Sequence, residues 1–146
     1  MLISEEDARW MERALEQAER CPPSATAFSV GAVIVVGGRA VAEGRSRAEQ
    51  PADHAEEVAL RRAAAPVAGA TVYSTMEPCG RRASRPEPCA RLLIEARVAR
   101  VVYALAEPDR FVGDPGGARM LREAGIEVEA MTEFAAAAER PNVHLR

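Results

Sequence analysis

The sequence contains no apolar run long enough to cross a membrane. Its most apolar stretch, VGAVIVVGG at residues 30–38, falls well short of the roughly 20 residues that a membrane-spanning helix needs. The opening residues, MLISEEDARW, are acidic and do not follow the basic-then-apolar order of a secretory signal peptide. These absences predict a cytoplasmic protein without a membrane partner.

An excess of positive charge is also missing. The 19 Lys and Arg residues are outnumbered by 22 Asp and Glu, which leaves a formal net charge of -3. Proteins that bind a nucleic-acid backbone without regard to its sequence usually present an excess of positive charge. We therefore expect a small-molecule substrate and disfavour nucleic acid as the partner.

Cysteine and histidine are scarce, with three and two residues respectively. Cys21, Cys79 and Cys89 cannot all pair with one another, and a reducing cytoplasm disfavours disulfides. No motif surrounds Cys21, so we expect an inert thiol near a helix end. His144 lies in the terminal tail, where we expect it to be exposed to solvent.

The 146 residues suit a single domain, because a chain of this size buries about two thirds of its unfolded surface. Ser4 and Asp53 are the expected N-caps of two helices, and Gly125 is the expected C-cap of another. Apolar periodicity predicts helices over residues 6–20, 54–65, 90–97, 114–125 and, ahead of a frayed tail, 132–140. Strands are predicted as a hairpin within 28–46 that turns at Gly37-Gly38, and over 70–75, 98–105 and 126–131.

Strands that alternate with helices after an opening hairpin are typical of an α/β domain. The pattern predicts three layers, α/β/α, with a mixed sheet of about five strands between two layers of helices. Helical crossovers connect the later strands, so we expect those strands to run parallel.

His54, Cys79 and Cys89 form a candidate zinc site, because zinc accepts imidazole nitrogen and thiolate ligands. Cys79 follows the strand over 70–75, at the edge of the sheet where α/β proteins keep their ligand sites, and His54 opens the preceding helix. Three ligands would leave a fourth position for water. Taken singly, each residue has an ordinary alternative, as a solvated histidine or as a cysteine buried like a small apolar residue.

Glu56 is the candidate proton-transferring group. It follows His54 by two positions, about 200° around a helix axis, yet in a first turn both side chains can point into one pocket. A carboxylate beside zinc can take a proton from water and return it to a leaving amine, and zinc deaminases pair His-x-Glu with Pro-Cys for this purpose. A purely structural zinc site usually closes with a fourth protein ligand and has no use for a free carboxylate.

The segments VGAVIV, HAEEVAL, TMEPCGRRASRPEPC and LREAGIEV together resemble the cytidine-deaminase-like superfamily, and within it the deaminase domain of bacterial riboflavin biosynthesis. The resemblance covers about residues 24–130. Nucleoside, deoxycytidylate and transfer-RNA deaminases usually have Pro-Cys-x-x-Cys, whereas EPCGRRASRPEPC follows the longer form of the riboflavin-pathway enzymes. The resemblance implies zinc as the cofactor, a diaminopyrimidinone carrying a ribosylamino phosphate as substrate, and a homo-oligomer, often a dimer.

The resemblance also suggests site residues. It places zinc on the same three ligands and proton transfer on the same glutamate, and it matches Arg85 to a basic residue that meets the substrate's phosphate. A solvated loop arginine is the alternative for Arg85, since Arg81 and Arg82 crowd the same loop.

The chain departs from the family pattern around the substrate. Ala27-Phe28 stands where the family usually has Asn-Pro, and Val58 replaces a histidine. Ser46 or Arg47 occupies the region of another histidine. Phe28 is a candidate to stack on a flat ring, with core filling as the alternative.

The sequence therefore predicts a zinc-dependent hydrolytic deaminase that removes an exocyclic amino group from a small pyrimidine base or nucleotide. Cytidine or deoxycytidylate deamination is the alternative reaction. A non-catalytic zinc-binding protein of the same fold is the alternative outside catalysis.

Overall fold

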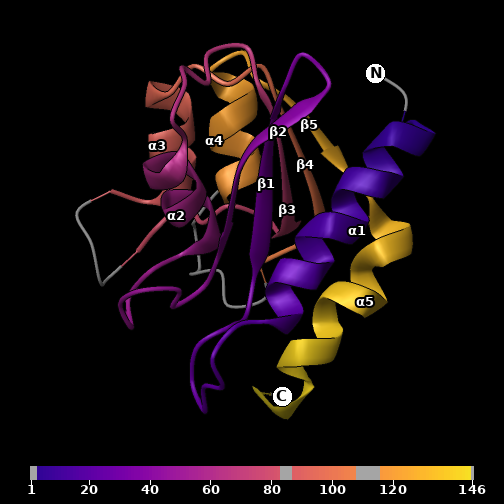
Figure 1. Ribbon diagram of the computed structural model, residues 1–146, viewed down its shortest axis with the longest axis vertical. Coiled ribbons are helices and arrows are strands. Elements are labelled where there is room, and N and C mark those ends of the chain that lie inside the picture. Colours follow the sequence, from indigo (N-terminus) through magenta and orange to yellow (C-terminus); the bar gives the residue numbers. More distant parts are fainter. Residues whose placement is uncertain (1–2, 83–86, 108–115, 146) are drawn as a thin grey trace.

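A five-stranded mixed sheet forms the centre of the computed structural model, which describes residues 3–82, 87–107 and 116–145 (Figure 1). The first two neighbouring pairs of strands are antiparallel and the last two are parallel, as predicted for the later strands. The strands lie in the order β2 (Arg39–Arg45), β1 (Gly31–Val36), β3 (Thr71–Met76), β4 (Arg100–Leu105) and β5 (Glu127–Ala130).

Helices cover both faces of the sheet, which confirms the predicted three-layer α/β/α architecture (Figure 1). One face carries α1 (Glu5–Glu19) and α5 (Ala135–Glu139), and the other carries α2 (Ala55–Arg62), α3 (Cys89–Glu95) and α4 (Gly117–Glu123).

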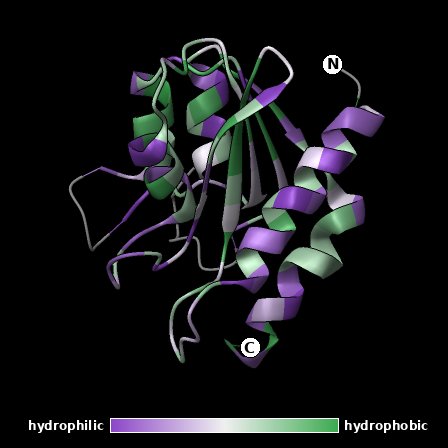
Figure 2. Ribbon diagram, viewed as in Figure 1, coloured by the Kyte–Doolittle hydropathy of each residue, from purple (hydrophilic) through white to green (hydrophobic). Residues whose placement is uncertain are grey.

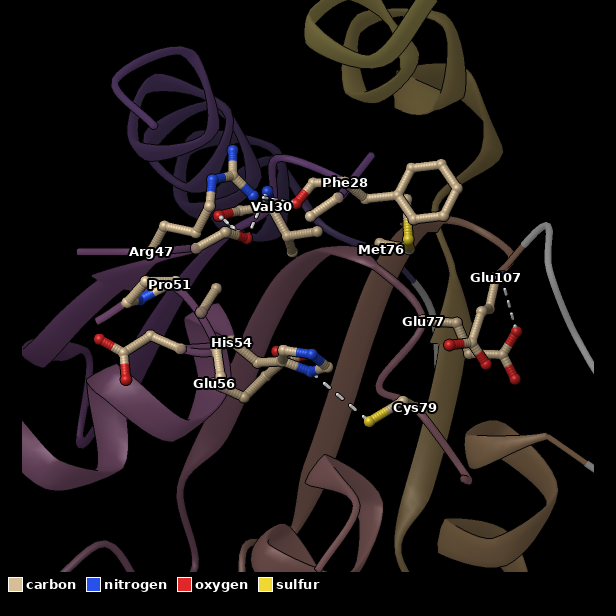
Figure 3. Close-up of a pocket in the computed structure, with 15 residues that line it drawn as sticks. Phe28, Val30, Arg47, Pro51, His54, Glu56, Met76, Glu77, Cys79 and Glu107 are labelled. Atoms are coloured by element: carbon tan, nitrogen blue, oxygen red, sulfur yellow. Dashed lines mark hydrogen bonds between the residues drawn. The ribbon is translucent and has the colours of Figure 1, made fainter. Parts of the chain in front are cut away.

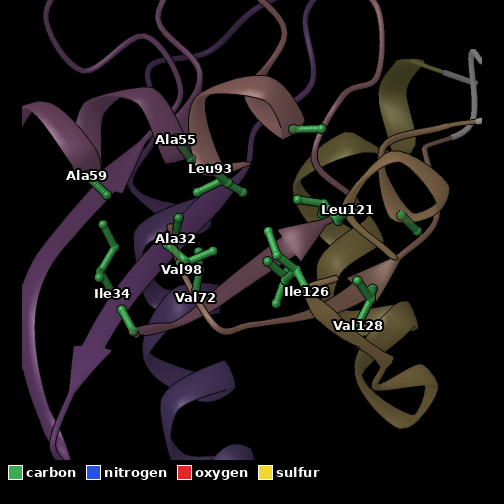
Figure 4. Close-up of a cluster of buried hydrophobic side chains, with 14 residues drawn as sticks. Ala32, Ile34, Ala55, Ala59, Val72, Leu93, Val98, Leu121, Ile126 and Val128 are labelled. Carbon is green, nitrogen blue, oxygen red and sulfur yellow. The ribbon is translucent and has the colours of Figure 1, made fainter. Parts of the chain in front are cut away.

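Each face has its own apolar core, because successive side chains of a strand point to opposite sides. In β1, Ala32 and Ile34 point to the side covered by α2, α3 and α4, and they belong to the same apolar core as Leu93 and Leu121 (Figure 4). Val33, the residue between them, packs toward α1 and α5. The central strands are accordingly hydrophobic, whereas much of α1 is hydrophilic on its outer surface (Figure 2).

The first helix begins where its capping residues predict. Ser4 and Asp7 form a capping box, in which each backbone N–H donates to the other residue's side chain, at 2.9 and 3.1 Å. The helix then lies directly on β1 at Gly31, where a Cβ atom would come within 1.9 Å of the Ala14 carbonyl oxygen. Any larger residue at position 31 would therefore push α1 away from the sheet.

Two predicted glycine turns are also observed. Gly37 and Gly38 connect β1 to β2 with φ values of 58° and 79°, the left-handed conformation that a primed hairpin turn requires. Gly125 follows α4 with φ 88° and ends that helix.

The predicted start and end of the second helix were wrong. His54, not Asp53, is the N-cap residue of α2. The Asp53 carboxylate is buried and accepts hydrogen bonds from the backbone N–H groups of Glu49 and Gln50, so it closes the preceding turn instead. The helix ends at Arg62, three residues before the predicted end, where the C-cap residue Ala63 adopts an extended backbone with φ −66° and ψ 122°.

The predicted frayed tail was also wrong. Arg140–Leu145 forms a 3₁₀ helix, and the Asn142 side chain is buried against the loop before β1. Its Oδ1 accepts from the Ser29 N–H at 2.6 Å, and its Nδ2 donates to the Ser29 carbonyl at 3.1 Å. His144 is exposed, as predicted, although its Nε2 donates to the Ser24 carbonyl at 2.7 Å.

Within the described ranges, the structure contains no helix that is both long enough and apolar enough to span a membrane.

Candidate active site

A cavity of about 450 Å³ opens beyond the carboxyl ends of β3 and β4 (Figure 3). Its walls come from five places in the chain. They are the loop before β1, the loop between β2 and α2, the start of α2, the segment that follows β3, and Glu107 after β4. This is the edge at which α/β sheets usually bind ligands.

His54, Cys79 and Cys89 meet beside this cavity. The His54 Nδ1 atom lies 3.6 Å from the Cys79 Sγ and 3.5 Å from the Cys89 Sγ, and the three atoms all lie within 4.8 Å of one another. Tetrahedral zinc with bonds of about 2.05 Å to nitrogen and 2.3 Å to sulfur separates these two ligand atoms by about 3.6 Å. The spacing of the side chains therefore fits a zinc ion.

The backbone around the two cysteines fixes this spacing. Cys79 follows β3, while Cys89 is the first residue of α3 and donates its N–H to the Cys79 Sγ at 3.2 Å. The Ala90 N–H donates to the Cys79 carbonyl at 3.1 Å. The start of α3 is thus bound to the turn that carries the other thiol.

Hydrogen bonding favours the thiolate form of Cys79. The hydrogen bond from the Cys89 thiol, together with those from the His54 ring and the Cys89 N–H, lowers the pKa of Cys79 to about 4 although burial opposes the charge. A thiolate is the form that binds a metal.

Glu56 lies in the same cavity as His54, as the first-turn geometry predicts. Its side chain is buried, with 4% of the residue exposed, and Oε2 accepts a hydrogen bond from the Ser74 hydroxyl at 3.1 Å. Burial raises the pKa of Glu56, and negative charge on Cys79 raises it further. A carboxyl group whose pKa is raised above its ordinary value holds a proton more readily, which suits a group that takes and returns one.

Arg82 binds the loop between the two cysteines to the start of α2. Its Nη2 donates to the Ala52 carbonyl at 2.6 Å and to the Glu57 Oε1 at 2.9 Å, and the same Oε1 accepts from the His54 N–H at 3.2 Å. The sequence did not predict that Arg82 connects these two segments. Arg85, the predicted phosphate-binding residue, lies outside the described residues.

Glu77 performs a similar connection on the opposite side of the site. Its buried carboxylate accepts from the backbone N–H of Glu107 at 3.1 Å and from that of Ala118 at 3.0 Å, and so binds the end of β3 to α4. Glu77 directly precedes the Pro-Cys motif, but the sequence did not indicate this contact.

Phe28 and Met76 lie on the same wall of the cavity (Figure 3). Phe28 is half-buried and belongs to neither of the two apolar cores, so it does not have the core-filling role given above as the alternative.

The loop that carries Phe28 is fixed by Arg47. The Arg47 guanidinium donates to the Phe28 carbonyl at 2.9 Å and to the Ser29 hydroxyl at 2.7 Å. It also donates to the Pro22 carbonyl at 2.7 Å. The sequence placed Arg47 in the region of a family histidine but did not indicate these backbone contacts.

Residues 4–105 match the family described as the cytidine and deoxycytidylate deaminase zinc-binding region. The diaminohydroxyphosphoribosylamino-pyrimidine deaminase of Schizosaccharomyces pombe is 41% identical over 124 residues, which cover 82% of this chain and 30% of that protein. The riboflavin biosynthesis protein RibD of Mycobacterium tuberculosis is 52% identical over 104 residues, which cover 69% of this chain and 29% of that protein. The chain thus spans about a third of the length of these curated relatives.

Solved structures show the same architecture. Acinetobacter baumannii RibD superposes with a TM-score of 0.80 at 36% identity, over 95% of this chain and 38% of that one. Aspergillus oryzae Rib2 deaminase in complex with DARIPP gives 0.77 at 26% identity, over 97% and 96% of the two chains. The dCMP deaminase of cyanophage S-TIM5, at 22% identity and a TM-score of 0.69, shares the fold. The match over residues 4–105 and the likeness to these relatives show that the chain belongs to the cytidine and deoxycytidylate deaminase family.

Proposed function

We propose that the chain is a zinc-dependent hydrolytic deaminase of a small pyrimidine, and that the riboflavin-pathway pyrimidine named for its relatives is the first substrate to test. One observation carries this proposal. A buried carboxylate, Glu56, shares a cavity with one imidazole and two thiols whose spacing suits zinc. The likeness to proteins named as riboflavin-pathway deaminases supports the choice of substrate.

In this proposal, the His54 Nδ1 and the Sγ atoms of Cys79 and Cys89 hold the metal. Zinc, when bound, supplies Lewis-acid activation of water near neutral pH. Both thiols must lose their protons to bind it, so the site requires reduced cysteines. This requirement fits a reducing compartment, and we place the chain in the cytoplasm on that ground.

Glu56 then moves protons between the attacking water and the ring. The carboxylate takes a proton from water as the water oxygen bonds to the amine-bearing carbon, and it delivers this proton to the neighbouring ring nitrogen. Glu56 then takes the proton of the new hydroxyl group on that carbon and delivers it to the exocyclic amino group, so that the C=O bond forms as the C–N bond breaks and ammonia leaves. The net reaction replaces the amino group with a carbonyl oxygen and consumes one water molecule.

The wall formed by Phe28 and Met76 is the proposed contact for the face of the ring. An aromatic side chain that is half-buried at a cavity can stack on a flat heterocycle. Phosphate binding by Arg85 stays a prediction.

Replacing Glu56 tests the proposal. We expect Glu56→Ala to keep fold and zinc but to lose at least about 100-fold in kcat, the usual scale for a general acid-base group. The assay is ammonia release from the riboflavin-pathway pyrimidine, cytidine, deoxycytidylate and purine analogues, measured side by side. Glu123→Gln, which changes an exposed carboxylate on α4, is the matched control.

The outcomes separate the candidate functions. An unchanged rate in Glu56→Ala would remove this residue from the mechanism. A preference of the wild-type chain for cytidine or deoxycytidylate would support the alternative reaction. Zinc binding without turnover of any compound would favour the non-catalytic alternative.

We further propose that the chain forms a homo-oligomer, in the simplest case a dimer. The proposal rests on the resemblance to associating deaminases. Sedimentation equilibrium of the zinc-loaded protein tests it, and a mass of one chain at micromolar concentration would contradict it.

A further inference from the structure

Strand β3 places a hydroxyl group directly beside Glu56. Ser74 is fully buried, and its Oγ lies 3.1 Å from the Glu56 Oε2 and 2.8 Å from the Met76 carbonyl oxygen. Val72 and Met76 are the neighbours of Ser74 on the same side of the strand, and both are apolar. Ser74 therefore brings a polar group between apolar neighbours to the face of the sheet covered by α2, α3 and α4, where Glu56 lies.

The Met76 carbonyl alone would satisfy the Ser74 hydroxyl, so the contact with Glu56 needs a separate explanation. A hydroxyl group both donates and accepts. The second contact crosses from β3 to α2, where it reaches one oxygen of the Glu56 carboxylate.

We propose that Ser74 is the positioning residue for Glu56. It holds Oε2 at the bottom of the cavity and so leaves the other carboxylate oxygen for the reacting protons. The proposal rests on the proposed function, because the orientation of Glu56 affects turnover only if Glu56 transfers protons.

The test compares Ser74→Ala with Thr75→Val in the zinc-loaded protein. Thr75 is the adjacent residue of β3, is equally buried, and accepts a hydrogen bond from the Gly31 N–H at 3.1 Å, away from Glu56. Both variants lose one buried hydroxyl group, but only Ser74→Ala loses the contact with the carboxylate.

We expect Ser74→Ala to lower kcat about tenfold, the equivalent of one hydrogen bond to a charged group, and to change KM by less than about twofold. Zinc content should stay at the wild-type level, and a crystal structure should show the Glu56 carboxylate turned from its wild-type position. Thr75→Val should keep the wild-type kcat even if its melting temperature falls.

An unchanged kcat in Ser74→Ala, or a Glu56 carboxylate that keeps its wild-type position in that crystal structure, would overturn the positioning role. An equal loss of kcat in Thr75→Val would also overturn it, because the loss would then follow from any buried hydroxyl of β3. Glu56→Ala distinguishes a failure of the proposed function from a failure of the positioning role. If Glu56→Ala keeps its rate, the proposed function fails; if only Ser74→Ala keeps its rate, the positioning role alone fails.

Discussion

Asp7 is a buried carboxylate that connects the first helix to the far side of the sheet from the active site. Its Oδ1 accepts from the Tyr73 hydroxyl at 2.6 Å and from the Arg100 Nη1 at 2.8 Å, and its Oδ2 accepts from the Arg100 Nη2 at 3.0 Å. Burial on its own would raise the pKa of Asp7, but the hydrogen bonds from Arg100 and Tyr73 outweigh it and hold this pKa well below its ordinary value of 3.8. The ionised form is therefore the stabilising one.

This depressed pKa predicts a pH-dependent stability. The contribution of Asp7 is fully present above its unfolded pKa, near 3.8, and is lost as the pH falls from there toward the lower folded value. We expect Asp7→Asn to lower the free energy of unfolding at pH 7 by about 2–3 kcal/mol, with a smaller difference from wild type at pH 3. Denaturant titrations at both pH values measure this. Glu6→Gln, at the exposed neighbouring position, is the control, and an equal difference at the two pH values would contradict the prediction.

The proposed metal ligands give a second prediction at the scale of single residues. We expect about one zinc ion per wild-type chain, because the three side chains form a single site. Cys89→Ala should lose the metal during gel filtration, since two ligands hold zinc less well than three. Cys21→Ala should keep it, because Cys21 contacts the Val30 carbonyl instead. Metal analysis of the eluted proteins decides, and a full zinc content in Cys89→Ala would exclude Cys89 as a ligand.

At the scale of elements, the site depends on the close contact between α4 and the turn after β3. A Cβ atom on Gly117 would lie 1.7 Å from the Pro78 carbonyl oxygen, so the helix begins against the backbone next to Cys79. A larger residue at this position must move either the helix or the turn.

We therefore expect Gly117→Ala to lower the free energy of unfolding by about 1–3 kcal/mol and to release zinc faster to a chelator. Gly125→Ala is the matched control. It introduces strain at a φ of 88°, beyond the end of the same helix, where a Cβ atom meets nothing within 4 Å. If both variants release zinc at the same rate, α4 does not support the turn after β3 that carries Cys79.

The same scale shows what a sequence can and cannot predict. The proximity of His54, Cys79, Cys89 and Glu56 was predictable because short motifs carry them and because strand-then-helix order brings those motifs to one edge of the sheet. Arg82 and Glu77 were missed because their partners, mostly backbone groups, lie 25 or more residues away along the chain. The capping role of Asp53 was wrong because two nearby N–H groups, at Glu49 and Gln50, bind its carboxylate instead.

At the scale of the whole molecule, zinc binding at the proposed site would be linked to folding. His54, Cys79 and Cys89 come from two helix starts and one turn, and unfolding would separate them. A ligand that binds only the folded state at 100 times its dissociation constant stabilises that state by about 2.7 kcal/mol. For a chain of about 150 residues, this corresponds to a rise of roughly 5–10 °C in melting temperature.

We expect this rise between the chelator-treated protein and the protein with zinc restored, measured by calorimetry. His54→Ala should show no such zinc-dependent rise, because it lacks one of the three ligands. A wild-type melting temperature that is the same with and without zinc would mean that the metal does not bind the folded chain preferentially.

Hydrogen bonds from two parts of the chain hold the loop that carries Phe28. Arg47 holds it from the side of α2, and Asn142, more than a hundred residues further along the chain, holds the backbone of Ser29 from the C-terminal 3₁₀ helix. If Phe28 contacts the substrate as proposed, a loop immobilised in advance loses little conformational entropy on binding. The last turn of the chain would then contribute to the affinity of a pocket that it does not line.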